Sequence, residues 1–364
     1  MAYKQIGFLC LIVLMFSQEK FQLKDTHEIK STSVKDQCKT GTCWSFSSAS
    51  FIETELIRKG HEPLDLSEMY FVYHNYLKKA DRYVKRHGNF VFSPGGLAQD
   101  NLKRLADIGM VPNSVYTDVV DEKGELDHSQ LDALLEAYVK TLVKQEKISS
   151  HWKEGFEGIL RAHLGTLPTE FKFEGDTYTP VSFAKKYGIK HSDYIELTSF
   201  THQPFYSEMV LEIPDNWDFN RSVNVPLDEF VDATVRALEE GYSVMWDGDV
   251  SEETFDAESG LAVFPENTEH DSLFVEPIEE KEVTQESRQK MYESYISKDD
   301  HLMHLVGLAE DVNGLRYFIV KNSWGTEGHF NGRIYMSENY FKAKTISVLF
   351  HKEALISSIK KELN

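Results

Sequence analysis

The stretch that decides the fold is VKDQCKTGTCWSF, residues 34–46. It is dense in glycine, threonine, cysteine and aromatic residues, and no hydrophobic period fits it before Trp44. Arg58 in a last turn, followed by Gly60, predicts that a helix beginning at Trp44 ends there. The apolar residues in between recur at helical spacing and share one face of that helix: Phe46, Ala49, Ile52 and Leu56. The stretch therefore leads into a helix and places Cys43 at its start.

A cysteine at the start of a helix can serve as a nucleophile. The free N–H groups and the dipole of the first turn stabilise the negative charge of a thiolate at Cys43. Gly41 lets the backbone turn tightly and lets a substrate approach. The side-chain amide of Gln37, together with the Cys43 backbone N–H, can hold the charge that develops on a carbonyl oxygen. The alternative for Cys43 is a buried structural cysteine, since free cysteine packs as a small hydrophobe.

A thiol nucleophile needs a base, and the base needs a partner that orients it. His301 begins the strand-like run HLMHLVGLA, and a second run, residues 315–321, ends directly before Asn322. A loop centred on residues 311–312 predicts that His301 lies opposite Asn322, whose amide oxygen can fix the imidazole tautomer. A tight turn at residues 313–314 would shift this pairing by four residues, about 13 Å. The assignment of His301 as base therefore requires the longer loop.

His304 is the competing histidine. Because it lies three residues beyond His301 in a strand, it is expected on the opposite face, where it packs or meets solvent. The same alternation argues against a metal site built from both histidines, and no metal or other cofactor is expected. Asp299 and Asp300 are interpreted as solvated charges at the entry of the strand.

The order of helical and strand-like patterns predicts an α+β fold. Helices are expected at 67–84, 97–109 and 226–240, with two more within 128–164. A hairpin is expected at 169–179, a loosely held polar arm at 18–36 and an acidic surface excursion at 266–290. Strands are expected mainly after residue 241, at 242–246, 261–264, 301–309, 315–321, 332–337 and 345–350.

Composition and charge limit the function classes. The net charge of −20 disfavours binding to phosphate backbones, so no nucleic-acid partner is expected. Residues 1–17 contain Lys4 and then an apolar run from Ile6 to Phe16, which is too short to span a bilayer and typical of a signal peptide. Export to a periplasm or out of the cell is therefore expected, without a stable membrane anchor, and a cytoplasmic location is the second choice.

Three blocks together, DQCKTGTCWSF, DDHLMHLVG and VKNSWG, resemble the active-site blocks of papain-like cysteine peptidases. Further segments, among them LSEMYFVYHNYLKKADRYV and SFTHQPFYSEMVLEIPDNW, resemble the bleomycin hydrolase/aminopeptidase C branch of that family. The resemblance runs from about residue 34 to residue 350. It implies a papain-like fold of two lobes with helical insertions, in which a cleft separates a helical lobe from a lobe built on a barrel-like sheet.

The resemblance also implies the extents of these parts. The helical lobe would occupy mainly residues 34–240, the sheet lobe mainly 241–350, and a C-terminal tail 351–364, all in one peptidase domain over 18–364. The resemblance also implies, as a hypothesis for this chain, that the end of the tail, residues 357–364, lies in the cleft, where its carboxylate binds the substrate's α-amine. The branch further implies a homohexamer with peptide substrates.

The resemblance assigns a role to each site residue by position. Cys43 would be the nucleophile, His301 the acid and base, Asn322 its orienting partner, and Gln37 the oxyanion donor. The resemblance also assigns Trp324 as a cover over the histidine–asparagine hydrogen bond, and Gly95 and Gly96 as the glycine pair that meets the substrate backbone.

One position departs from the family pattern, because Cys38 stands where the family usually has glycine. A β-carbon there could crowd the oxyanion loop, and a disulfide between Cys38 and Cys43 would silence the enzyme; an inert substitution is the preferred interpretation. The function expected is a cysteine-type aminopeptidase that works through a thioester. The alternatives are a papain-like endopeptidase and a non-catalytic peptide-binding protein on the same scaffold.

Overall fold

The computed structural model describes residues 21–120, 122–268 and 273–363. The signal peptide expected at residues 1–17 therefore lies outside the described residues. Within the described ranges, no helix is both long enough and apolar enough to cross a membrane.

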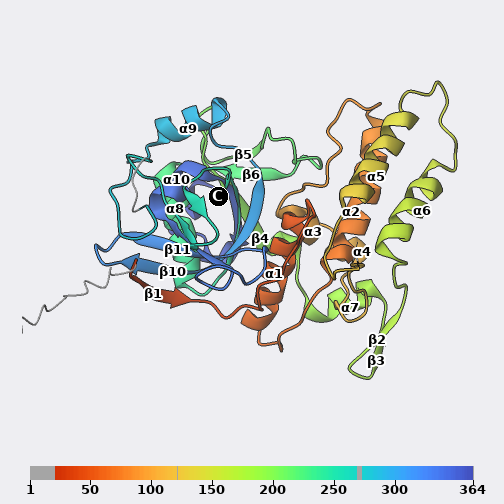
Figure 1. Ribbon diagram of the computed structural model, residues 1–364, viewed down its shortest axis with the longest axis horizontal. Helices are drawn as coiled ribbons and strands as arrows, with labels where there is room; N and C mark the ends of the chain where they lie inside the picture. The colour runs from red at the N-terminus through yellow and green to blue at the C-terminus, as the bar shows by residue number, and fades with distance from the viewer. Residues whose placement is uncertain (1–20, 121, 269–272, 364) are drawn as a thin grey trace, which may run out of the picture.

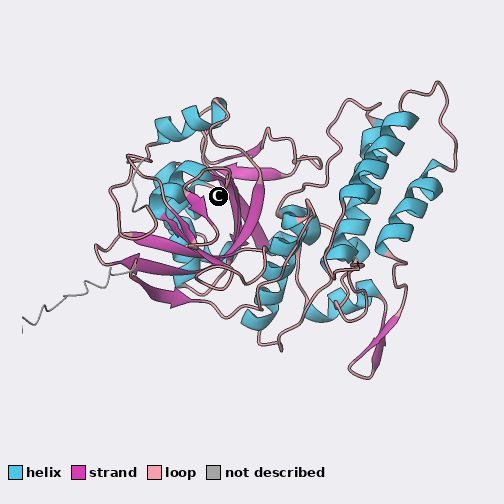
Figure 2. Ribbon diagram, in the orientation of Figure 1, coloured by secondary structure: helices cyan, strands magenta, loops and turns pink. Residues whose placement is uncertain are grey.

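The first half of the chain is mainly helical, as Figures 1 and 2 show. Its helices are α1 Cys43–Arg58, α2 Glu68–Lys85, α3 Gln99–Leu102, α4 Leu105–Ile108, α5 Ser129–Leu142, α6 Trp152–Leu164 and α7 Pro180–Tyr187. The hairpin expected at 169–179 is confirmed, with strands β2 Phe171–Phe173 and β3 Asp176–Tyr178. The helix expected at 97–109 is instead two short helices, α3 and α4, interrupted at residues 103–104.

The second half is organised by one sheet of eleven strands, in the order β5-β6-β4-β13-β7-β10-β11-β12-β9-β8, with β1 paired to β10. The strands are β1 Leu23–Glu28, β4 Tyr194–Thr198, β5 Ser207–Val210, β6 Arg221–Asn224, β7 Val244–Gly248, β8 Phe255–Asp256, β9 Leu261–Ala262, β10 His301–Asp311, β11 Arg316–Lys321, β12 Arg333–Ser337 and β13 Thr345–His351. The helices of this half are α8 Leu227–Glu239, α9 Gln285–Glu293, α10 Glu338–Lys344 and α11 Ser357–Glu362.

Two expectations for this half need correction. Residues 23–28, part of the expected loose arm, form strand β1, which pairs with β10 and contributes backbone hydrogen bonds although its side chains are mostly exposed. Residues 194–224, placed in the helical lobe from sequence, contribute three strands to the large sheet. These strands are four or five residues long and are joined through β13, which is distant in sequence, so local periodicity does not reveal them.

Helix α1 lies where the two halves meet (Figure 1). It packs on α2 on one side and on β10 on the other. This explains why α1 has hardly any solvent-exposed face, since its residues from Trp44 to Leu56 are buried. The buried hydroxyl groups find partners across the junction: Ser47 Oγ donates to the Met303 carbonyl at 2.8 Å. The start of α1 and the start of β10 are therefore fixed against each other.

The two halves have separate cores. One core is built from α1, α2, α5 and α6 and reaches Leu302 and Leu349 on the near face of the sheet. The other lies among β7, β10, β11, β13, α8 and α10, and the strands curve around these two helices in Figure 1. The C-terminal helix α11 belongs to this second core, because Ile359 is fully buried there.

Candidate active site

Cys43 is the first residue of α1, as its sequence context predicts. Thr42 precedes it and makes no side-chain capping bond, so the first N–H groups of the helix are not occupied by a cap. Gly41 is required by packing, because a β-carbon there would lie 2.6 Å from Cγ of Pro94. Trp44 anchors the other side of Cys43, since its indole N–H donates to the Pro94 carbonyl at 2.9 Å. The nucleophile candidate is thus held between two fixed neighbours.

The thiol of Cys43 meets the segment that carries His301. Burial raises the pKa of the Cys43 thiol to about 12, while the backbone N–H of Leu302 opposes this rise by donating toward the sulfur. Leu302 directly follows His301 at the beginning of β10. The structure therefore brings the cysteine of the first half to the histidine strand of the second half.

His301 is buried and its ring is oriented by Asn322. The imidazole Nε2 lies 2.8 Å from Asn322 Oδ1. The same oxygen accepts the backbone N–H of Ser323 at 2.8 Å, which identifies it as the acceptor and leaves Nε2 as the donor. Nδ1 is then the unprotonated nitrogen of the neutral ring. Burial lowers the pKa of His301 to about 4, and the bond to Asn322 opposes this shift.

The expected strand register is wrong, although the expected contact is present. The turn between β10 and β11 spans residues 311–315, where the Gly314 N–H donates to the Asp311 carbonyl at 3.0 Å. The register pairs His304 with Lys321, after a bulge between Leu305 and Gly307. Asn322 lies just beyond the end of β11, so its side chain can reach His301 diagonally without being its cross-strand partner.

Trp324 covers the imidazole. Its ring centroid lies 4.7 Å from that of His301, with the ring planes inclined by 34°. Its other edge meets Phe255 at 5.9 Å. With 40% of its surface exposed, Trp324 lies between the buried histidine and solvent, where the resemblance places a cover.

Gln37 is held by hydrogen bonds at both ends of its amide. Its oxygen accepts the hydroxyl of Ser323 at 2.6 Å, and its nitrogen donates to the Thr40 carbonyl at 2.8 Å. An amide nitrogen carries two hydrogens, so one donor remains for a substrate oxygen. Ser323 thereby connects Gln37 to Asn322, a link that no sequence spacing indicated.

Cys38 adopts a backbone conformation that favours glycine, the residue that the resemblance leads us to expect at this position. Its φ is 48°, in the left-handed region where a β-carbon is strained. Its N–H donates to the side chain of Asp36 at 2.7 Å, which helps to hold this turn. Cys38 and Cys43 are both free thiols.

Gly95 and Gly96 lie beside the cysteine helix, each against a different group. A β-carbon on Gly96 would come within 2.9 Å of the Trp44 ring. A β-carbon on Gly95 would fall 1.7 Å from a carboxylate oxygen of Asp215. The carbonyl of Gly95 accepts the buried ammonium of Lys79, which also donates to the Pro94 carbonyl at 3.1 Å. Lys79 and Asp215 were not anticipated from sequence.

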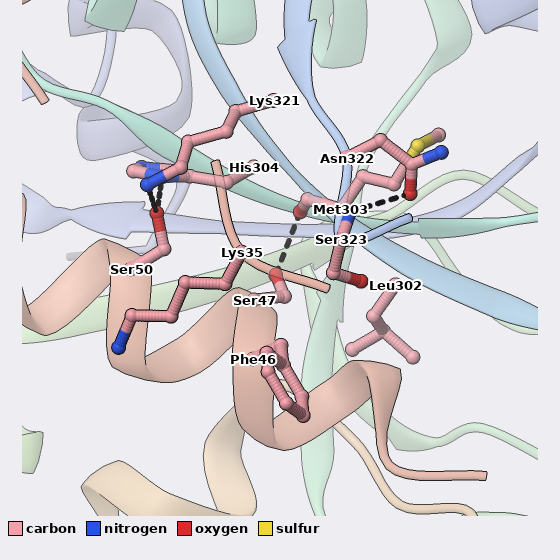
Figure 3. A pocket seen from close by; sticks show the side chains of 10 residues that line it. All are labelled: Lys35, Phe46, Ser47, Ser50, Leu302, Met303, His304, Lys321, Asn322 and Ser323. Carbon is pink, nitrogen blue, oxygen red and sulfur yellow. Dashed lines mark hydrogen bonds between the residues drawn. The ribbon is translucent and has the colours of Figure 1, made fainter. Parts of the chain in front are cut away.

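His304 packs away from the candidate site, as strand alternation predicts. Its Nδ1 lies 2.8 Å from the hydroxyl of Ser50 on α1, and Lys321 donates to the same hydroxyl at 2.8 Å. Figure 3 shows both side chains converging on Ser50 in a small cavity of about 10 Å³, roughly the space of one water molecule. Burial lowers the pKa of His304 well below its usual range. This histidine therefore joins the two halves of the molecule.

The interpretation of Asp299 as a solvated charge is wrong. Its Oδ2 atom is buried without a hydrogen-bond partner in the described structure, and burial raises the pKa of its carboxyl to about 8. Asp300 is exposed and accepts the Val250 N–H at 3.0 Å, as a charge at a strand entry can. Between the buried Ser297 and His301, exposed and inward-facing residues alternate, and single-residue chemistry does not reveal which aspartate points inward.

Comparisons with known proteins agree with this geometry. The model of the Peptidase C1-like family matches residues 108–364, and that of the papain family cysteine protease matches residues 18–79. The second match contains Gln37 and Cys43, and the first contains His301 and Asn322.

Similar proteins of known sequence and structure cover most of the chain. Aminopeptidase C of Lactobacillus delbrueckii subsp. lactis is 26% identical over 95% of this chain and 85% of its own length. Aminopeptidase G of the same organism is 24% identical over 90% of this chain and 83% of its own. The crystal structure of PepW from Lactobacillus rhamnosis HN001 shares the fold, with a TM-score of 0.72 at 23% identity over 93% of this chain and 84% of that one. The family match over residues 108–364 identifies the chain as a member of the Peptidase C1-like family, with the papain-like α+β fold.

Proposed function

We propose that this protein is a cysteine-type aminopeptidase that removes the first residue of a peptide through a thioester. The observation that carries the proposal is the arrangement of Cys43 at the start of α1, beside the strand whose His301 is oriented by Asn322. Relatives named aminopeptidase C and aminopeptidase G support removal of an amino-terminal residue as the reaction.

The first chemical step is acylation. The sulfur of Cys43 attacks the carbonyl carbon of the first residue, and its proton passes to Nδ1 of His301. Because Nε2 already donates to Asn322, the imidazolium that forms keeps its orientation. The carbonyl oxygen becomes an oxyanion, which the Cys43 backbone N–H and the remaining amide hydrogen of Gln37 stabilise. His301 then protonates the leaving amine, and the shortened peptide departs.

The second step is hydrolysis of the thioester. His301 takes a proton from water, and the hydroxide adds to the carbonyl carbon. The carbon–sulfur bond then breaks, the released residue departs as the free amino acid, and His301 returns the proton to the sulfur of Cys43. Burial favours the neutral pair in the free protein, because it raises the pKa of Cys43 to about 12 and lowers that of His301 to about 4. Proton transfer therefore accompanies attack on the substrate, and the oxyanion donors contribute most when charge develops.

The test uses a free-amine peptide and its N-acetylated form, incubated with the wild-type protein and with Cys43→Ala. The expected result is loss of single amino-terminal residues from the free-amine peptide alone, and no products with Cys43→Ala. Internal cleavage of the acetylated peptide would instead assign the endopeptidase alternative. Absence of cleavage, together with absence of iodoacetamide labelling at Cys43, would assign the non-catalytic binding protein.

Assembly and location belong to the same proposal. The branch resemblance supports a homohexamer, which sedimentation velocity of the purified protein tests directly. The apolar run within residues 1–17 supports export. The amino-terminal mass of protein from the native cell tests it, and a chain that retains Met1 and this run would contradict export.

A further inference from the structure

Three aspartates from distant segments meet next to the candidate nucleophile. Asp215 lies in the loop after β5, Asp247 lies in β7, and Asp299 immediately precedes β10. The side chains of Asp247 and Asp299 contact each other, and the backbone N–H of Asp215 faces the Asp299 carboxyl. The fold thus brings together three carboxyl groups that the sequence separates by up to 84 positions.

This acidic cluster, defined as Asp215, Asp247 and Asp299, lies near Cys43, because Asp247 is paired in the sheet with Leu302, whose backbone N–H faces the sulfur. Asp299 and Asp215 both raise the pKa of the Cys43 thiol, after the larger effect of burial. Asp215 also lies against Gly95, where a β-carbon would come 1.7 Å from its Oδ2, while Ser93 donates to its Oδ1 at 2.9 Å. Gly95 therefore leaves room for a carboxylate at the place where the resemblance expects substrate backbone.

The cluster contains oxygens that the described protein leaves without donors. Asp247 is 1% exposed, and its Oδ1 has no hydrogen-bond partner; Oδ2 of Asp299 is likewise buried and unpartnered. Other groups near the cluster, Glu196 and Asp300, are also acidic. A buried carboxyl without a donor or a counter-charge is costly. Without a ligand the two contacting carboxyls stay protonated, because burial raises the pKa of both. A ligand that brings N–H donors and positive charge would supply partners for these oxygens and favour their ionised form.

The nearby cation does not satisfy the two orphaned oxygens. Lys79 is 5% exposed and attracts Asp215, but its ammonium donates to the backbone carbonyls of Ser93, Pro94 and Gly95. The positive charge that complements Asp247 and Asp299 must come from another source.

We propose that Asp215, Asp247 and Asp299 bind the α-ammonium group of the substrate's first residue, an assignment that rests on the aminopeptidase function above. In any peptide the amine nitrogen lies about 2.5 Å from the carbonyl carbon of its own residue. A group that recognises the free amine of the residue being cleaved must therefore lie near the attacking sulfur, and Asp247, the sheet partner of Leu302, has that position. An ammonium group supplies three N–H donors, and its charge favours ionisation of the carboxyls that receive it.

On this assignment, amino termini are selected by side chains of the peptidase domain and not by the carboxylate of the C-terminal tail. The tail expected to supply a carboxylate packs instead, through the buried Ile359 of α11, into the core that contains α8 and α10. Residue 364, which carries the terminal carboxylate, lies outside the described residues.

The test compares leucyl-7-amido-4-methylcoumarin with its N-acetylated form in four variants: Asp215→Asn, Asp247→Asn, Asp299→Asn and the control Glu280→Gln. Glu280 is a partly buried carboxyl near Asp311, at the other end of β10 from His301, and it accepts the Phe264 N–H at 2.9 Å. The aspartate variants are expected to lose at least 10-fold in kcat/KM on the free-amine substrate, mainly through KM. The kcat/KM of these variants on the acetylated substrate is expected to rise or stay unchanged. The control variant is expected to match wild type on both substrates.

A cooperative urea unfolding transition reports whether each variant is folded. A variant without such a transition is set aside, and the partly exposed Asp215 then decides the result. If the wild-type protein cleaves the free-amine substrate and the aspartate variants retain its preference over the acetylated form, the assignment is overturned while the enzymatic function stands. If the wild-type protein cleaves neither substrate and Cys43 is not labelled, the proposed function itself fails. A loss confined to substrates with lysine or arginine side chains would also overturn the assignment, by making the cluster a side-chain subsite.

Discussion

His301 and Asn322 form a 2.8 Å hydrogen bond although they are not paired across their strands. The bond depends on the position of Asn322 directly after β11 and on the Ser323 N–H that fixes its amide. Both residues are buried, at 3% and 4% exposure, so water does not compete strongly for the imidazole. This arrangement assigns the proton to Nε2 and leaves Nδ1 as the base.

Replacing Asn322 with alanine should reduce kcat by roughly 10² while Cys43 stays accessible to iodoacetamide. The reason is that the imidazole loses the acceptor that selects its tautomer, whereas the position of the thiol is set by α1. Steady-state kinetics on a free-amine peptide measures the effect. Asn322→Gln serves as a comparison, since its amide oxygen is displaced by one methylene and should rescue only part of the rate. Equal rates for all three proteins would contradict an orienting role.

The sequence was sufficient to predict the contact between His301 and Asn322, but not the register that produces it. The expected loop at residues 311–312 and the observed turn at 311–315 differ by only a few residues. A bulge after Leu305 and the diagonal reach of Asn322 offset that difference. Bulges depend on pairing with neighbouring strands, here β1 and β7, so they cannot be predicted from the local periodicity of the sequence.

The helix of Cys43 was predictable because its apolar spacing and its glycine stop are local signals. The acidic cluster was not, because it depends on three segments that meet only in the folded chain. Asp299 illustrates the difficulty. Beside a second aspartate at a strand entry it has the pattern of a solvated charge, and only the packing of β7 and the loop after β5 buries it.

Gln37→Ala should lower kcat by about 10²- to 10³-fold with a smaller change in KM, as expected for loss of one oxyanion donor. The donor acts when charge develops on the substrate oxygen, so binding of the ground state is affected less. Comparison with Ser323→Ala isolates the positioning effect, since that hydroxyl holds the Gln37 oxygen at 2.6 Å. The serine variant should lose less kcat than the glutamine variant. If both variants changed KM but not kcat, Gln37 would not be an oxyanion donor.

His304→Ala should leave the reaction largely intact and reduce stability by about 1–3 kcal/mol. His304 bonds Ser50 on α1, and its removal leaves that hydroxyl with fewer partners and a space in the core. Urea unfolding and peptide cleavage, measured on the same protein, separate the two effects. His301→Ala is the matched variant and should abolish cleavage. A His304 variant that folds but loses cleavage would show that the roles of the two histidines were assigned wrongly.

Stability should fall as pH rises from about 5 to 8, and Asp299→Asn should flatten this slope. Burial, followed by the charge of Asp215, raises the pKa of Asp299 to about 8, whereas an unfolded aspartate titrates near 4. Between these values the folded state binds more protons than the unfolded chain, so raising the pH favours unfolding, by up to about 1.4 kcal/mol per pH unit. Urea unfolding at several pH values measures the slope. Asp228→Asn, at an exposed position on α8, should behave like wild type. An unchanged slope in Asp299→Asn would mean that this carboxyl is ionised in the folded protein.

Removing residues 357–364 should destabilise the protein but preserve its preference for free amino termini. The deletion takes Ile359 out of a core where it is fully buried, a loss of about 1.5–3 kcal/mol. The acidic cluster remains, so single-residue trimming should continue and acetylated peptides should stay resistant. Mass spectrometry of both peptide forms, below the unfolding temperature of the shortened chain, gives the answer. Ile359→Ala in the full-length protein is the control, since it carries the same packing loss with the terminus intact. Internal cleavage by the shortened chain, but not by Ile359→Ala, would instead assign the selection of amino termini to the tail carboxylate.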